Sequence, residues 1–179
     1  RAPYAALAGV AAGLEPAALR ALAAAPGKAV WRPSYILLLR PAGDDRGAAE
    51  GWLERVRVAG ERGRFQEAAE RARHAEAAIT RAGAPVDLAD ALLLLRGVLR
   101  TNLGELVEAE ADLRAALRSA ETRHGEGALE TASIHASLGN LLRVESRLEE
   151  ALAAHRRALA IDREALGGRH PRVGRDLHN

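Results

Sequence analysis

A glycine returns every 42 residues along this chain, at Gly83, Gly125 and Gly167. The residues around it return too, since Gly97 recurs as Gly139. A fixed period of this length indicates stacked supersecondary units, because a unit this small buries its apolar face only against its neighbours. We therefore expect a repeat array with an extended surface for partners, and not one closed globule.

The composition predicts that the units are helical. Hydrophobic residues make up 48% of the chain but aromatic residues only 3%, so Ala, Leu and Val must build the core. Apolar side chains recur at three-to-four spacing from Leu88 to Leu99 and again from Leu106 to Leu117, as on one face of a helix. Short turns at Gly104-Glu105 and at its counterparts in the other units separate two helices within each unit.

The repeat places unit boundaries at 48–85, 86–127 and 128–169, and a truncated fourth unit at 170–179. Residues 1–47 do not follow the period, and we interpret them as a short N-terminal helical segment that ends in a linker over 41–47. This segment either caps the array or forms the tail of a preceding domain. The chain contains no Met, so we expect it to be a piece of a longer protein.

The third unit resembles tetratricopeptide repeats, specifically the 42-residue variety found in kinesin light chain and in bacterial multidomain proteins. The resemblance rests on Leu138-Gly139, on 147–151, on 165–167 and on His170-Pro171. It covers about three quarters of the chain and implies an all-α fold, a right-handed α-solenoid of antiparallel helix pairs. Several slots depart from the family, which has large aromatic residues at Arg100, Leu113, Leu142 and His155 and a Leu-Gly pair at Arg55-Val56.

By this resemblance, the first helix of each unit lines a concave groove that binds a partner protein or peptide. Asn140 and Arg143 are the strongest candidates for contact, because an amide can bind a peptide backbone and a guanidinium can fork onto a carboxylate. The remaining groove positions in the same register are Arg57, Leu94, Val98 and Thr101, flanked by Leu53 and Ala136. The carboxylate clamp of chaperone-binding relatives is not expected, since Arg57 and Val98 replace residues that it needs.

No catalytic, cofactor-binding or metal site is expected. The histidines lie on different helices and turns, and none is three or four residues from another His or from a Cys, the spacing that zinc sites use. Gly125-x-Gly127 lacks both the third glycine and the preceding strand of a dinucleotide-binding loop. The formal net charge is only +2, with Arg and Glu interspersed, which argues against a nucleic-acid partner. With no apolar run long enough to span a membrane, we expect a cytoplasmic protein, of bacterial origin because Arg almost replaces Lys.

Three hypotheses for function follow. The favoured one is a protein–protein interaction scaffold that holds a partner peptide or helix in its groove. The alternative is a regulatory or sensor segment of a larger bacterial signalling protein, such as a Ser/Thr kinase whose catalytic domain lies outside this chain. The third is self-association through the unfinished C-terminal end of the array.

Overall fold

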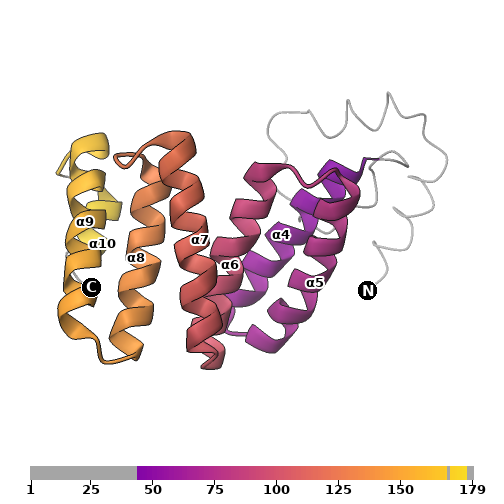
Figure 1. Cartoon of the computed structure of the whole chain (residues 1–179), viewed down its shortest axis with the longest axis horizontal. Coiled ribbons are helices and arrows are strands. Elements are labelled where there is room, and N and C mark those ends of the chain that lie inside the picture. The colour runs from indigo at the N-terminus through magenta and orange to yellow at the C-terminus, as the bar shows by residue number, and fades with distance from the viewer. Residues whose placement is uncertain (1–43, 169, 177–179) are drawn as a thin grey trace, which may run out of the picture.

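The chain folds as a row of antiparallel helices. The computed structural model describes residues 44–168 and 170–176, and Figure 1 shows the helices standing side by side, with α4 and α5 at one end of the row and α9 and α10 at the other. Across these residues the regular structure is entirely helical, which confirms the expected all-α class. The helices are α4 (Asp45–Glu61), α5 (Phe65–Arg81), α6 (Val86–Leu103), α7 (Leu106–His124), α8 (Leu129–Val144), α9 (Leu148–Leu166) and α10 (Pro171–Asp176).

The helices pack as successive pairs. The most extensive contacts join α4 to α5, α6 to α7 and α8 to α9, which we call the first, second and third pairs. The second helix of each pair also packs on the first helix of the next, so that α5 contacts α6 and α7 contacts α8. The short helix α10 continues the row by packing on α9, where its Val173 is fully buried.

The recurring glycine lies in the turn after each second helix. Its φ is 82° at Gly83, 88° at Gly125 and 80° at Gly167, all in the region that L side chains rarely adopt. At the last two, ψ is 161° and 152°, a combination essentially restricted to glycine. The glycine therefore ends each second helix, as the sequence predicted.

The first described helix begins earlier than the sequence predicted. The Asp44 side chain accepts a hydrogen bond from the Gly47 backbone N–H at 2.8 Å and caps the helix that starts at Asp45. The expected linker over 41–47 is thus wrong for its last three residues, because an aspartate cap starts the helix before the repeat period does. The rest of the expected N-terminal segment, 1–43, lies outside the described residues.

In the second and third pairs, a glycine inside the first helix allows the second helix to approach very closely. A Cβ added at Gly97 would lie 2.6 Å from Leu113 Cγ, and one added at Gly139 would lie 2.6 Å from His155 Nε2. Both glycines therefore allow close packing between the helices of their pair. In the first pair the sizes are reversed: Val56 stands at the glycine position and Ala72 opposite, and both are buried in one core cluster.

This size exchange predicts a compensation between two substitutions. Gly97→Val alone should cost about 1–3 kcal/mol through overpacking, and Leu113→Ala alone about 2–5 kcal/mol through the space it leaves. The double variant reproduces the Val56 and Ala72 arrangement, so it should be more stable than the sum of the single effects predicts. Urea unfolding followed by circular dichroism measures all three variants against the parent chain. Strictly additive losses would show that these residues do not share one contact.

Candidate functional site

The first helices of the pairs form one continuous face, which we call the first-helix face. α4 contacts α6 and α6 contacts α8, whereas no comparable contact joins α5 to α7 or α7 to α9. The row therefore bends toward α4, α6 and α8. An ion pair between Arg46 and Asp87 links the first two of these helices directly.

The predicted groove residues on α6 lie along this face. Leu94 is partly buried and Val98 is 38% exposed. The Thr101 hydroxyl donates to the Gly97 carbonyl at 2.9 Å, so it is occupied within its own helix. On α6 the face thus offers apolar contact and few free polar groups.

The predicted polar residues differ sharply from one pair to the next. Arg57 is held by its own helix, with Nε 2.9 Å from Glu54 Oε2, Nη2 2.6 Å from Glu54 Oε1, and a further pairing with Glu61. Asn140 and Arg143 are exposed on α8, and their side chains form no hydrogen bond or ion pair with any described residue. Of the predicted groove residues, these two therefore present polar side-chain groups that are available to a partner.

A cavity of about 380 Å³ opens where α6, α7 and α8 meet, and we call it the inter-pair cavity. Leu94 is the predicted groove residue that lines it. Its apolar lining consists of Ala91, Leu94, Ala116, Ala120 and Ile134. The sequence pattern does not predict this cavity, because its lining comes from side chains of three helices at once.

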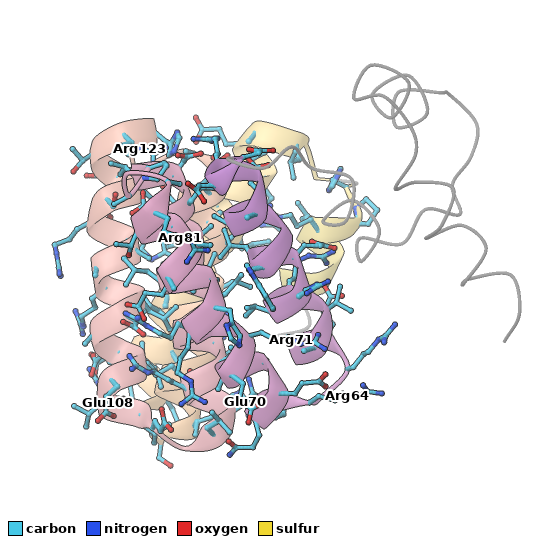
Figure 2. The ribbon with its side chains drawn as sticks, turned by 90° about the vertical axis from the view of Figure 1, so that its right-hand side faces the viewer. Arg64, Glu70, Arg71, Arg81, Glu108 and Arg123 are labelled. Carbon is cyan, nitrogen blue, oxygen red and sulfur yellow. The ribbon has the colours of Figure 1, made fainter. Side chains whose placement is uncertain are left out.

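The rim of the inter-pair cavity carries more acidic than basic groups. It includes Asp87, Asp90 and Glu130 against Arg123, with His124 and Ser133 beside them. Asp90 accepts hydrogen bonds from Ser119 Oγ at 2.7 Å and from Arg123 Nη1 at 2.6 Å. Figure 2 shows Arg123 near one end of the helices, with Arg64 near the other.

A buried charge cluster in the second pair was also missed. Asp112, whose side chain is 8% exposed, receives two hydrogen bonds of 2.8 Å from Arg96 and one of 2.6 Å from Arg100. Arg100 stands where the family has a large aromatic residue, so a salt bridge replaces apolar packing there. The only sequence signal was an acidic residue on the apolar face of a second helix.

A second cavity, of about 220 Å³, lies between α5 and α6. Two of its charged groups are engaged in ion pairs with acidic neighbours, Arg96 with Glu76 at 3.4 Å and Arg100 with Glu105 at 3.6 Å. Along α5 the outer surface is charged, as Figure 2 shows at Arg64, Glu70, Arg71 and Arg81.

Two of the histidines are shielded from solvent. Burial lowers the pKa of His155, and the nearby Arg143 lowers it further. Burial also lowers the pKa of His135. Neither belongs to a group of three or more His, Asp or Glu side chains suited to a metal ion, and the described part of the chain contains no such group.

Three exposed apolar side chains gather at the turn between α8 and α9. Val144 is 47% exposed, Leu148 57% and Leu152 49%. Leu106, the counterpart of Leu148 in the second pair, packs against a core cluster that includes residues of the next pair. Self-association through this end of the array stays a prediction. Among the described helices, none has the length and apolar character that crossing a membrane requires.

Comparison with known proteins supports the fold. No family model and no curated protein matches the chain. The chain is similar to the crystal structure of BtubC (BKLC) from P. vanneervenii, a kinesin-light-chain-like tetratricopeptide protein, with a TM-score of 0.61 and 18% identity. The match covers 80% of this chain and 57% of that one. The fold is therefore an all-α helical repeat of the tetratricopeptide type.

The shielded His155 predicts a loss of stability in mild acid. The unfolded chain binds the proton at the ordinary pKa, about 6.5, whereas folded His155 binds it only at lower pH. Its contribution is thus complete above the ordinary pKa and is lost as the pH falls through the folded pKa. His155→Leu, which copies Leu113, should weaken the fall in unfolding free energy between neutral pH and mild acid.

The parent chain provides the reference, and His124→Gln, which removes an exposed histidine, tests whether any histidine substitution has the same effect. Urea midpoints measured across this pH range give the comparison. Equal slopes for His155→Leu and the parent chain would contradict the assignment.

Proposed function

We propose that this chain is a protein-interaction scaffold whose first-helix face binds an extended peptide or a helix of a partner protein. The observation that carries the proposal is the inter-pair cavity, which two first helices, α6 and α8, line together with α7 and which includes the predicted groove residue Leu94. Concave apolar sites with a few convergent polar groups are the usual form of a binding site. The tetratricopeptide-type fold adds support, because helical repeats present extended binding surfaces.

The binding mechanism combines an apolar anchor with polar orientation. A partner side chain enters the inter-pair cavity, while the Asn140 amide and the Arg143 guanidinium bind the backbone and a carboxylate of the partner. The cavity residue Ser133 and Arg143 are ten residues apart on α8, about 15 Å along the helix. An extended peptide spans that distance with about five residues, so a short segment reaches both ends of the site.

The test begins with peptides selected from a random display library on the immobilised chain. Asn140→Ala combined with Arg143→Ala should weaken the selected peptides about tenfold or more, because charge-assisted hydrogen bonds are lost. Fluorescence anisotropy measures the affinity and circular dichroism checks that helicity is unchanged.

The matched control is Glu149→Ala combined with Arg156→Ala on α9. Both side chains are exposed, on the second helix of the same pair, and neither forms an ion pair with a described residue. This variant should bind as the parent chain does. If the Asn140 and Arg143 variant also binds normally while folded, the assignment of the first-helix face is wrong. A library that yields no peptide would count against a peptide scaffold altogether.

A further inference from the structure

The array contains a second place equivalent to the inter-pair cavity, one repeat further along, where α8 and α9 meet α10. There the chain fills the space with its own side chain. Arg172 Nε lies 2.5 Å from Asp162 Oδ2, and Arg172 Nη2 donates to the Leu129 carbonyl at 2.9 Å and to Ser133 Oγ at 2.8 Å. Asp162 is 1% exposed, so this guanidinium ties α10 into a buried acidic site.

The residues one repeat before the three partners of Arg172 line the inter-pair cavity. Residues 42 positions before Leu129, Ser133 and Asp162 are Asp87, Ala91 and Ala120, and all three line the inter-pair cavity. The counterpart of Arg172 itself is Glu130, which is exposed at the rim. The cavity is therefore the space that an arginine side chain occupies in the next repeat, and the sequence supplies a carboxylate there in place of the arginine.

We propose that the inter-pair cavity receives an arginine side chain from the partner protein. This inference rests on the proposed function and names the partner residue that the cavity selects. The methylene stem would lie on Ala91, Leu94 and Ile134, and the guanidinium would face the acidic rim. Arginine fits better than lysine, because its planar fork binds carboxylates in two directions and is more weakly hydrated.

The carboxylates of the rim can still accept hydrogen bonds from a further cation. Glu130 forms no ion pair with a described residue. Asp87 already pairs with Arg46, which holds the Asp87 pKa below its ordinary value and keeps the carboxylate charged. A carboxylate has about four acceptor sites, and Asp112 in this same molecule binds two guanidinium groups at once.

The charge of the rim separates this occupant from others. Asp87 and Asp90 are already paired with Arg46 and Arg123, so Glu130 supplies the unpaired negative charge that would repel a phosphate or an acidic side chain. A purely apolar side chain would contact the apolar lining but would form no ion pair with the carboxylates. The arginine proposal therefore requires that removing the positive charge from the probe removes most of the binding.

The test is a nuclear magnetic resonance titration of the whole chain with N-acetyl-arginine methylamide. The methyl signals of Ala91, Leu94 and Ile134 should shift and saturate at a concentration on the order of 1–10 mM, the range expected for one side chain. The citrulline and leucine analogues should bind about tenfold more weakly or worse. Absence of shifts with the arginine probe, or equal binding of the leucine probe, would overturn the proposal.

Three variants sharpen the titration. Glu130→Gln should weaken the arginine probe severalfold, whereas Glu149→Gln on α9 should not change it. Ala120→Asp combined with Glu130→Arg copies the Asp162 and Arg172 pair, so the chain should fill its own cavity and no longer bind the probe. Where that double variant does not fold, the Glu130→Gln comparison still decides the question.

The outcome is separable from that of the proposed function. Library peptides that require Asn140 and Arg143 but contain no arginine, and that bind Glu130→Gln normally, would keep the scaffold and overturn the arginine site. Arginine-containing peptides that weaken with Glu130→Gln would support both.

Discussion

The close approach of two helices within each pair is the contact on which the rest of the structure depends. Each pair places one small and one larger side chain at that contact: Gly97 with Leu113, Gly139 with His155 and, with the sizes exchanged, Ala72 with Val56. Packed interiors tolerate such exchanges when the combined volume is kept. Each of the three pairs therefore keeps one small and one larger residue at these two repeat positions, although the residues themselves vary.

The repeat period makes equivalent positions comparable along the array. Residues 42 positions apart, or 41 between the first and second pairs, hold the same repeat position in neighbouring pairs. This is why Arg172 and Glu130 can be compared at all, although one is joined to a buried aspartate and the other is exposed. The helix arrangement repeats along the array, whereas the side chains at equivalent positions and their partners differ.

The sequence predicts well the features that recur in every repeat, and poorly those that occur in one repeat alone. Helix pairing, the turn glycines and the close packing at Gly97 and Gly139 follow from local periodicity, which one chain displays directly. The cluster of Asp112 with Arg96 and Arg100 does not, because side chains on two helices choose their partners only once the helices are packed. The inter-pair cavity escapes prediction for the same reason, since small residues from three helices leave it open.

The same distinction explains why the predicted groove residues are not equivalent. Arg57, Val98 and Asn140 share one repeat position, yet Glu54 and Glu61 hold Arg57 within its own helix while Asn140 has no described partner. We therefore expect Arg57 to take no part in partner recognition, because carboxylates of its own helix bind it, and Arg172 fills the inter-repeat space beside α10 in the same way. On this proposal, recognition is concentrated where the chain leaves its own polar groups and cavities unfilled, which in the described residues means α8 and the inter-pair cavity.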